Sequence, residues 1–394
     1  MPELPQPWRS PLRGPRLTSI LGSMLLVLVG VVAVTGFLSH AAYNPYLGHN
    51  AVIPRGQDFK PFTFTWPASP SWLYALNQGL HVTVGIVAVP LLLAKLWSVI
   101  PRLFEFPPVR SVAHLFERVT ALALVGGAIF QFGTGIFDVQ LYYPWHFNFV
   151  EAHYYGAWVF CSALVLHVGT KFPVMVKAFR TRRELLEGPG GLVAPDPAPP
   201  TISRRGFLGG VGAAMGGMFI LTAGQSIGGP LRKAALLAPR GGGDDFPVNK
   251  TAAFAKVGRV DASWRLKLVV NGRHVVSLSR AELLALPQRS YDLPIACVEG
   301  WSTTQRWSGV RLADLARHAG APNASQVQVE SLQPAGAFRQ TTLAANELHA
   351  EQSLLALSVN GAELPLDHGF PARIIVPALP GVHNTKWVGE MRFT

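Results

Sequence analysis

Two cysteines and several histidines are the residues of this chain whose type and spacing could do chemistry. Cys297 stands in the stretch IACVEGWSTT, between an apolar triplet and a tryptophan, whereas Cys161 lies in a long apolar run. Two such cysteines make no disulfide framework. A thiolate is a soft ligand for a transition metal, and a buried thiol packs as a small hydrophobe. We interpret Cys161 as a packing residue and Cys297 as a candidate metal ligand, with a purely structural role for Cys297 as the alternative.

Three histidines, His81, His153 and His167, lie inside apolar stretches, where ionisable residues are candidates for function. His153 and His167 are 14 residues apart. In a helix this spacing corresponds to about 21 Å along the axis and to within about 40° of one face. Because neutral imidazole is a good iron ligand, one helix could serve two haems, with His81 at the depth of His153. Histidines that only hydrogen-bond to neighbouring helices, in a cofactor-free membrane protein, are the alternative.

The elements that must position these residues begin with five long uncharged stretches. Charged residues make up only 14 % of the chain, whereas a soluble protein usually carries about 25 %. Each stretch reaches the roughly 20 residues that a helix needs to cross a bilayer core. The sequence predicts an all-α transmembrane bundle of four helices and a fifth anchor helix, over Leu17–Phe37, Trp72–Ala94, Val119–Phe137, Ala152–Thr170 and Gly206–Leu231.

The distribution of lysine and arginine predicts the orientation of these helices. Fourteen of these residues flank the helix ends on one side, and only Arg55 and Lys60 lie in the loops on the other. The positive-inside rule therefore places the N-terminus in the cytoplasm. Much of the net charge of +12 is thus a topology signal, and no stretch interleaves basic and aromatic residues as a nucleic-acid site needs. We expect no nucleic-acid partner.

The fifth apolar stretch follows Ser203-Arg204-Arg205-Gly206-Phe207-Leu208, which resembles a twin-arginine export signal. A basic flank before an ordinary helix is the alternative. The preceding residues 181–203, rich in proline and glycine, are predicted to be a cytoplasmic linker. Residues 204–231 would be the signal and a retained anchor, recognised by the twin-arginine export machinery. This route carries folded proteins with their cofactors, so residues 232–394 are expected outside the cytoplasmic membrane of a bacterium.

Residues 1–180 are predicted to form a four-helix membrane domain, and about residues 15–180 resemble the cytochrome b subunits of formate dehydrogenases. The resemblance implies that His81 and His153 bind the iron of an outer haem b, and that His167 binds an inner one. The family has an inner ligand near the start of helix one, where this chain has no histidine. His40 lies at the wrong end of that helix, and His114 is the possible replacement. We expect one haem b, or two if His114 serves.

Residues 232–394 show strand and turn signals in place of long apolar runs. The stretch WRLKLVVNGRHVVSLS alternates around an Asn-Gly turn, which predicts a hairpin. SRAELLALP predicts a short capped helix, and VQVESL, LLALSVNG and ARIIVPALPG predict further strands. We expect a mixed α+β domain.

Three runs of this domain, CVEGWS, WSGVRLADLARHAG and LDHGFPARIIVPALPGVHNTKWVGEMRFT, resemble the molybdopterin domain of the sulfite oxidase family. The branch that looks most similar contains bacterial extracytoplasmic reductases such as the periplasmic methionine sulfoxide reductase. The resemblance implies a molybdenum–molybdopterin cofactor, with Cys297 as the thiolate ligand of the metal and as the catalytic residue. It also implies the pterin-binding residues Asn249, Ser331, His368, Arg373, Asn384, Thr385 and Lys386.

The sequence departs from the family where the substrate would bind. Sulfite oxidases carry an arginine two residues before the cysteine, whereas this chain has Pro294, Ile295 and Ala296 there. Arg306 and Arg339 are possible substitutes for that cation. We expect reduction of a small-molecule oxide or another sulfur-containing substrate, with electrons from the quinone/quinol pool. A sulfite-oxidase-like dehydrogenase and a non-catalytic redox-linked binding or sensor protein are the alternatives.

Overall fold

The structure of the chain, a computed structural model, describes residues 10, 12–50, 59–104, 108–180, 199–239, 246–336 and 338–394. Most of the predicted linker 181–203 therefore lies outside the described residues. Contacts between residues divide the chain into two compact units. The helical unit comprises Met1–Val34, Leu80–Ala223 and Ala235–Pro239, and the catalytic-domain unit comprises Thr35–Gly79, Gly224–Ala234 and Arg240–Thr394.

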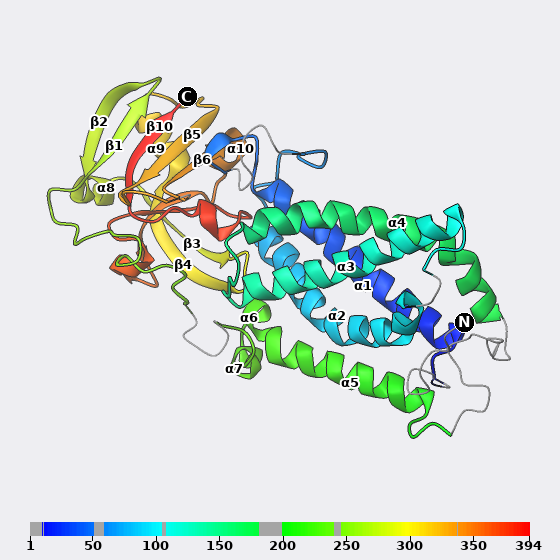
Figure 1. Ribbon diagram of the computed structural model, residues 1–394. Helices are drawn as coiled ribbons and strands as arrows, with labels where there is room; N and C mark the ends of the chain where they lie inside the picture. Colours follow the sequence, from blue (N-terminus) through cyan, green and yellow to red (C-terminus); the bar gives the residue numbers. More distant parts are fainter. Residues whose placement is uncertain are drawn as a thin grey trace. The chain divides into compact units, whose positions relative to one another are not determined.

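Five helices of the described chain are long and apolar enough to cross a membrane, which indicates a multi-pass membrane protein (Figure 1). They extend beyond the predicted stretches at most of their ends, because flanking polar residues continue the helical turns. The helices are α1 (Pro15–Ala42), α2 (Leu73–Leu103), α3 (Val112–Val139), α4 (Phe149–Arg180) and α5 (Arg204–Thr222).

Small residues allow helices α3 and α4 to pack closely. A Cβ atom on Gly127 would lie 3.2 Å from the Cβ atom of Phe160, and one on Gly156 would lie 2.3 Å from Nε2 of Gln131. Glycine at such crossings is typical of membrane helices, whose association depends on close packing. The approach places the His153 turn of α4 directly against α3.

The fifth long helix ends earlier than the predicted range 206–231. Helix α5 stops at Thr222 and is followed by two short helices, α6 (Gly224–Ile227) and α7 (Pro230–Ala234). Gly228 and Gly229 have positive φ angles of 75° and 60°, a left-handed conformation that glycine adopts readily and that interrupts a helix. The stretch of weakly apolar residues thus contains one long helix and a folded turn.

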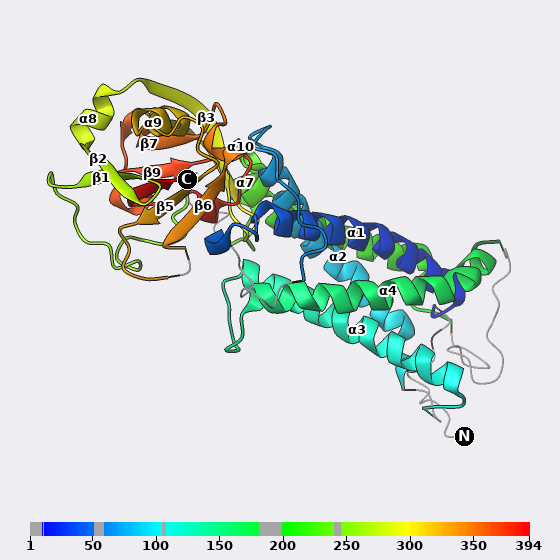
Figure 2. The same ribbon diagram turned by 90° about the horizontal axis from the view of Figure 1, so that it is seen from above.

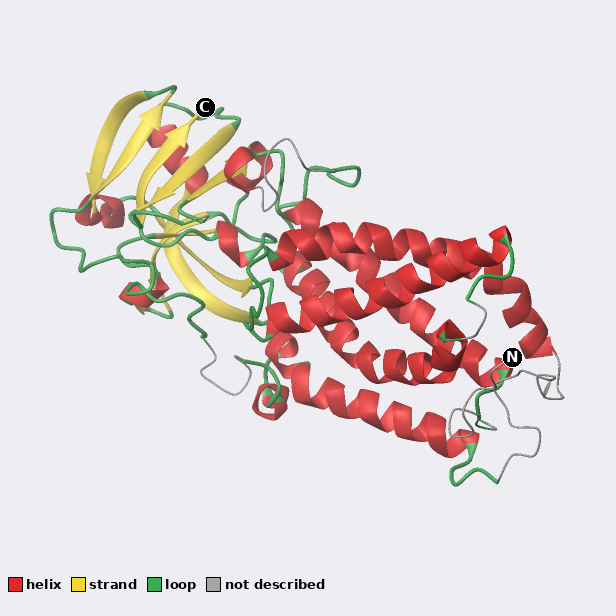
Figure 3. Ribbon diagram, in the orientation of Figure 1, coloured by secondary structure: helices red, strands yellow, loops and turns green. Residues whose placement is uncertain are grey.

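All strands of the described residues lie in the catalytic-domain unit, as the colouring of Figure 3 shows. They form two sheets, ordered β2-β1-β10-β5-β6 and β3-β4-β7-β8, with β9 paired to β7. The first sheet contains β1 (Arg265–Val270), β2 (Arg273–Ser279), β5 (Gln326–Ser331), β6 (Gln340–Ala344) and β10 (Val388–Phe393). The second contains β3 (Gln288–Ala296), β4 (Ser302–Arg311), β7 (Leu354–Val359), β8 (Ala362–Glu363) and β9 (Arg373–Ile375).

Short helices and 3-10 turns connect these strands, and Figure 2 shows them from above. They are α8 (Arg280–Ala285), α9 (Leu312–His318), α10 (Ala345–Leu348), η3 (Leu366–His368) and η4 (Gly381–His383). A further 3-10 turn, η2 (Gly48–Asn50), lies between α1 and α2. The predicted fold class, an apolar helical bundle followed by a mixed α+β domain, is confirmed.

Local sequence signals explain the first hairpin and the helix that follows it. Asn271 and Gly272 have φ angles of 47° and 79°, the left-handed pair that a two-residue turn between antiparallel strands requires. Ser279 and Glu282 form a reciprocal capping box at the start of α8. Both features were predicted from the sequence.

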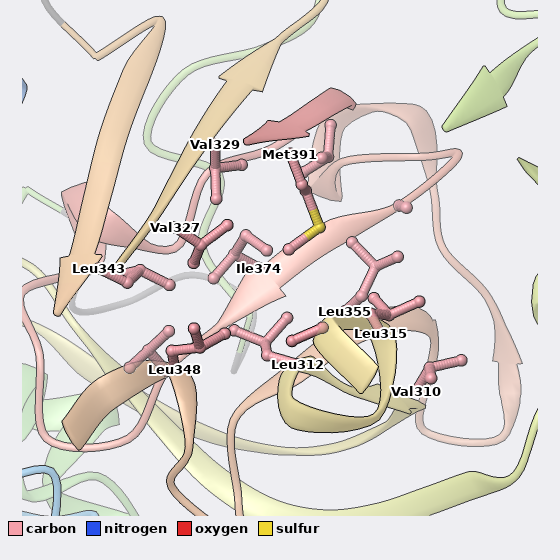
Figure 4. Packing of buried hydrophobic residues seen from close by; sticks show 14 of the residues in the cluster. Val310, Leu312, Leu315, Val327, Val329, Leu343, Leu348, Leu355, Ile374 and Met391 are labelled. Atoms are coloured by element: carbon pink, nitrogen blue, oxygen red, sulfur yellow. The ribbon is translucent and has the colours of Figure 1, made fainter. Parts of the chain in front are cut away.

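The core of the catalytic-domain unit lies between its sheets and short helices. Figure 4 shows side chains from both sheets and from α9 and α10 packed together, with Ile374 and Met391 near the centre. Trp66, which lies before α2, and Tyr74, which lies in its first turn, belong to the same buried cluster. The indole Nε1 of Trp66 donates to the carbonyl of Ala378 at 2.6 Å. The segment between α1 and α2 and the first turn of α2 therefore contribute Trp66 and Tyr74 to this unit's core.

Candidate functional site

Cys297 lies in the tight loop between β3 and β4. Its backbone N–H donates to the carbonyl of Trp301 at 2.9 Å, and its own carbonyl accepts from the N–H of Gly300 at 3.0 Å. Gly300 has a φ of 91°, which a residue with a side chain rarely adopts. The Cys297 side chain is buried among apolar residues of the second sheet. The loop thus holds the thiol in one position.

Cys297 lies at the wall of a small hollow of about 40 Å³. Six of the predicted site residues line it together: Cys297, Asn249, His368, Arg373, Asn384 and Lys386. The remaining two do not line it. Ser331 instead donates its hydroxyl to the carbonyl of Lys386 at 2.8 Å, and Thr385 lies between two lining residues in the chain. Residues up to 137 positions apart in the sequence therefore converge beside one thiol.

Two glycines permit the backbone to approach closely here. Gly369 follows His368 with a φ of 115°, and a Cβ atom on it would lie 3.0 Å from the Cβ atom of Arg373. A Cβ atom on Gly381 would lie 3.0 Å from the carbonyl oxygen of Ala296, the residue before the cysteine. Any larger residue at these positions would push apart the segments that line the hollow.

Arg373 is the most deeply buried cation of the hollow, with only 5 % of its surface exposed. Its guanidinium donates to the carbonyls of His368 at 2.9 Å and Asn384 at 3.2 Å, and lies 5.0 Å from the ring centre of Trp307. Burial lowers its pKa from 12.5 to about 9. A buried cation held only by neutral partners is costly unless an anion joins it.

Several donors in this region are suited to a polar, anionic group. Among the described residues, Nε of Arg373, Nδ2 of Asn384 and Oγ1 of Thr385 are buried without a hydrogen-bond partner. Buried polar groups are normally paired, and charge-assisted hydrogen bonds from arginine favour phosphate. Together with a single thiolate, this donor set fits a molybdenum cofactor whose pterin carries a phosphate.

His368 and Phe246 cover one side of the hollow. Their rings stack with centroids 3.6 Å apart and planes 10° from parallel. Burial, and then the charges of Arg373 and Lys386, lower the pKa of His368 to about 4, so its ring is neutral at pH 7.

Sequence reasoning missed some residues of the hollow. Trp301, just before β4, and Thr303 line it, and burial at every second position continues along β4 through Gln305 to Trp307. The sequence gives no clear sign of this alternation, because Thr303 and Gln305 are as polar as the exposed residues between them. Phe246 had no signal either, because its place depends on the fold of the whole domain.

The two arginines considered as substitutes for the missing substrate cation lie elsewhere. Arg306 forms an exposed ion pair with Asp292 at 3.6 Å, and Arg339 pairs with Glu330. Neither lines the hollow. Side chains alternate between the two faces of β4, so Arg306 points to the face opposite Trp307 and away from the hollow.

In the helical unit, the structure brings His81 of α2 and His153 of α4 together. Their ring centroids are 6.2 Å apart, and the planes are nearly perpendicular at 83°. Nδ1 of His81 lies 3.0 Å from the carbonyl oxygen of Val32, and Nδ1 of His153 lies 2.9 Å from Oγ1 of Thr134. The predicted match in depth between these two histidines is therefore observed.

The hydrogen bonds define which nitrogen of each ring carries the proton. A carbonyl oxygen can only accept, so Nδ1 of His81 donates to Val32. The hydroxyl of Thr134 also lies 2.7 Å from the carbonyl oxygen of Phe130; when it donates there, its oxygen accepts from Nδ1 of His153. Both rings then have the lone pair on Nε2, and metal-binding histidines commonly donate their other N–H in this way.

The separation of the rings also suits a shared metal. Metal–nitrogen bonds of about 2 Å on each side separate two opposed nitrogens by about 4 Å, and each ring centre lies about 1 Å further out. The resulting distance of about 6 Å agrees with the observed 6.2 Å. The spacing of the two ring centres thus matches that of two imidazoles on one metal ion.

His114 and His167 line a different cavity of about 580 Å³ in the helical unit. Most of its lining is apolar, with Lys95, Glu117 and Lys171 among the polar residues. Nδ1 of His114 accepts a hydrogen bond from the backbone N–H of Arg110 at 3.1 Å. Neutral His114 therefore carries its proton on Nε2, which is the reverse of the arrangement at His81. Cys161 packs with leucines beside this region, as a small apolar residue would.

Comparison with known proteins agrees with the site in the catalytic-domain unit. Residues 254–394 match the family described as the oxidoreductase molybdopterin-binding domain. The C-terminal part of the chain is therefore similar to molybdopterin-binding oxidoreductase domains, including those of sulfite oxidases, and five long apolar helices precede it.

Three relatives illustrate the range of similar proteins. The uncharacterized oxidoreductase YuiH of Bacillus subtilis is 33 % identical over 132 residues, which cover 33 % of this chain and 65 % of the relative. The putative protein-methionine-sulfoxide reductase subunit YedZ1 of Azospira oryzae is 34 % identical over 152 residues, 38 % and 56 % of the two chains. Mouse mitochondrial sulfite oxidase is 32 % identical over 156 residues, 33 % and 29 %. The chain thus spans less than two thirds of each relative's length.

Proposed function

We propose that the chain is a membrane-anchored molybdenum oxidoreductase that transfers an oxygen atom between substrate and water. The observation that carries this proposal is the convergence of Cys297 with the buried donors of Arg373 and Asn384. Cys297 would bind the metal, and Arg373, Asn384 and Lys386 would hold the phosphate and polar edge of the pterin. His368, Asn249, Ser331 and Thr385 would complete this pterin site. When bound, the cofactor supplies two-electron chemistry at the metal.

We also propose that His81 and His153 bind one haem b, which supplies single-electron transfer. The support is their 6.2 Å separation and the two Nδ1 hydrogen bonds that direct Nε2 toward a metal. His167 would serve a second haem only with another ligand, because the Arg110 bond leaves Nε2 of His114 protonated. The structure thus favours the His81–His153 pair over His114.

The cavity lined by His167 is our candidate site for a quinol. Binding sites for small molecules are typically 300–1,000 Å³ and mostly apolar, with a few placed polar groups. This cavity has about 580 Å³, with His167, Lys95 and the Glu117–Lys171 ion pair beside apolar side chains of α1 to α4. The apolar part suits an isoprenoid tail, and the polar groups suit the oxygens and protons of a quinol head.

We propose the reductase direction, with a neutral oxide such as a sulfoxide as the substrate. The two cations of the hollow are already engaged: Arg373 contacts backbone carbonyls, and Lys386 donates to the carbonyls of Lys250 and Asp367 at 2.7 and 2.9 Å. No other cation lines the hollow among the described residues. A sulfite-like dianion would therefore lack a partner. The resemblance to a putative methionine-sulfoxide reductase subunit also supports this direction.

The proposed setting is the cytoplasmic membrane of a bacterium, with the N-terminus inside and the catalytic domain outside. Support comes from the lysine and arginine distribution and from Arg204 and Arg205 at the start of α5, which Ser203 caps. Export by the twin-arginine route would follow cofactor insertion in the cytoplasm.

The experiment that tests the function combines metal analysis with spectroscopy on the purified full chain and on Cys297→Ala. We expect near-stoichiometric molybdenum whose coordination changes in Cys297→Ala, and a b-type haem band in both proteins. In membrane vesicles, sulfoxide reduction should require quinol. Haem without molybdenum would overturn the enzyme assignment, and molybdenum without turnover by any artificial donor would support the binding or sensor alternative.

A further inference from the structure

Three side chains from outside the β-sheets hold the loop that carries Cys297. Nε2 of Gln78 donates to the carbonyl of Val298 at 2.6 Å, and the hydroxyl of Ser226 donates to the carbonyl of Gly300. The guanidinium of Arg232 donates to the carbonyl of Ser302 at 2.5 Å. All of these residues belong to the catalytic-domain unit. Of the three carbonyls, the one that Gln78 contacts is nearest to the thiol in the chain, because Val298 directly follows Cys297.

Gln78 is fixed at both ends of its carboxamide. It is buried, with 6 % of its surface exposed. Its Oε1 accepts a hydrogen bond from the hydroxyl of Ser39 at 2.9 Å, while its Nε2 holds Val298. A buried amide with both groups paired has one orientation, because a flip would place like groups against each other. Gln78 therefore presents a defined donor to the Cys297 loop.

Gln78 is also three residues before His81 on the same helix, α2. In a helix, three residues correspond to about 4.5 Å along the axis, and the two side chains lie on neighbouring parts of one face. This relation depends only on the continuous backbone of α2. One helical turn thus carries a residue that binds the cysteine loop and the residue that we propose as a haem ligand.

We infer that Gln78 is a positioning residue that couples the molybdenum site to the haem helix. The connection runs from Cys297 through the peptide of Val298 and the Gln78 hydrogen bond to the turn of α2 that carries His81. The inference rests on the proposed function. Per turnover, an oxide substrate takes up two electrons and two protons and yields the reduced product and one water. The electrons come from a quinol, which becomes a quinone and releases two protons.

Two other residues provide matched controls. Ser226 shares with Gln78 the contact to the cysteine loop but not the place on α2, and Asn77 shares with it the place on α2 but not that contact. Ser226 holds the same loop, through Gly300, but belongs to α6, which has no histidine. Asn77 is adjacent to Gln78 on α2 and also buried, but its side chain donates to the carbonyl of Thr35 at 2.9 Å. Ser226→Ala therefore tests the loop alone, and Asn77→Leu tests the helix alone.

The first experiment compares two rates in the full chain: oxidation of prereduced haem by a sulfoxide, and sulfoxide reduction with a reduced viologen. The second rate bypasses the haem. In Gln78→Met the ratio of the first rate to the second should fall on the order of tenfold, the factor that corresponds to one hydrogen bond. The ratio should stay within about twofold of wild type in Ser226→Ala and Asn77→Leu. An unchanged ratio in Gln78→Met, or an equal fall in Ser226→Ala, would overturn the inference.

The second experiment needs no cofactor. Alkylation of Cys297 by iodoacetamide in cofactor-free full-length protein, followed by peptide mass spectrometry, reports how often the loop opens. We expect alkylation on the order of tenfold faster in Gln78→Met and unchanged in Asn77→Leu. Equal rates in Gln78→Met and wild type would show that Gln78 does not position the loop. Absence of a haem band in the wild type would overturn the proposed function instead, and the spectrum distinguishes the two failures.

Discussion

Replacing Arg373 with methionine tests whether the hollow is built for an anion. Methionine keeps a flexible apolar chain of similar length but removes the buried charge. In the structure the guanidinium has two backbone carbonyls and the Trp307 ring as its partners, and Nε has none among the described residues. We expect opposite consequences for the cofactor-free and the cofactor-loaded protein.

The magnitude follows from two opposing contributions. The lowering of the Arg373 pKa from 12.5 to about 9 corresponds to about 5 kcal/mol, at about 1.36 kcal/mol per pKa unit, that the buried charge costs the cofactor-free fold. Its removal leaves the carbonyls of His368 and Asn384 unpaired, which costs about 1–3 kcal/mol each. The two contributions nearly cancel, so cofactor-free Arg373→Met should stay within about 3 kcal/mol of wild type. Cofactor binding should weaken about 10- to 150-fold for each hydrogen bond lost, because hydrogen bonds from a charged donor contribute about 1.5–3 kcal/mol each.

The assay is thermal unfolding of the full chain in detergent, followed by tryptophan fluorescence, with molybdenum content measured in parallel. Wild type should gain thermal stability on loading, since a ligand that binds only the folded state stabilises it. Arg373→Met should show no gain and no molybdenum. Arg306→Met is the control, because that arginine forms an exposed ion pair of little energetic consequence. Loss of stability well beyond 3 kcal/mol in cofactor-free Arg373→Met, or normal molybdenum content, would refute the reasoning.

Three further predictions follow from contacts in both units. Thr134→Val removes the acceptor of the His153 Nδ1 proton and should weaken haem binding about 10- to 100-fold, whereas Thr134→Ser should retain it, as haem titration would show. Burial raises the pKa of Glu347 from 4.5 to about 7. Between these two pH values the folded state holds a proton that the unfolded state releases, so the stability of the fold should decrease as pH rises from about 4.5 to about 7. Glu347→Gln should abolish that decrease in unfolding curves measured across this range. Gly381→Ala should push the Ala296 strand away and lower molybdenum content in purified protein, while Gly258→Ala, at an exposed position with open space around it, should not.

Much of the fold could be predicted because its signals are local. Uninterrupted apolar runs predicted the long helices, and the Asn271-Gly272 pair between alternating residues predicted the first hairpin. The resemblance to the sulfite oxidase family implied a common site for His368, Arg373 and Asn384, and only a short loop and a strand separate them in the chain. In each case the residues that decide the structure lie within one or two elements of each other.

Other features could not be predicted because they depend on distant contacts. Phe246 stacks on His368, 122 positions further along the chain, and an isolated phenylalanine in a loop gives no sign of such a partner. The Nδ1 bonds of His81 and His114 point to opposite tautomers, although both histidines looked like haem ligands. Only the neighbouring backbone groups distinguish them, and their positions come from the packing of separate helices.

The segment between the first two helices shows why the boundary of the catalytic domain was the hardest feature to predict. Its aromatic residues resemble an interfacial loop, yet Trp66 and Tyr74 are almost fully buried in the core that contains Leu266 and Ile374. Trp66 also holds Ala378, which lies in the loop that leads to Gly381 at the hollow. A domain that begins at residue 232 would therefore lose part of its core and one support of its cofactor site. That support comes from the segment before α2, so contacts between residues far apart in the chain define the extent of this domain, and local sequence signals could not reveal it.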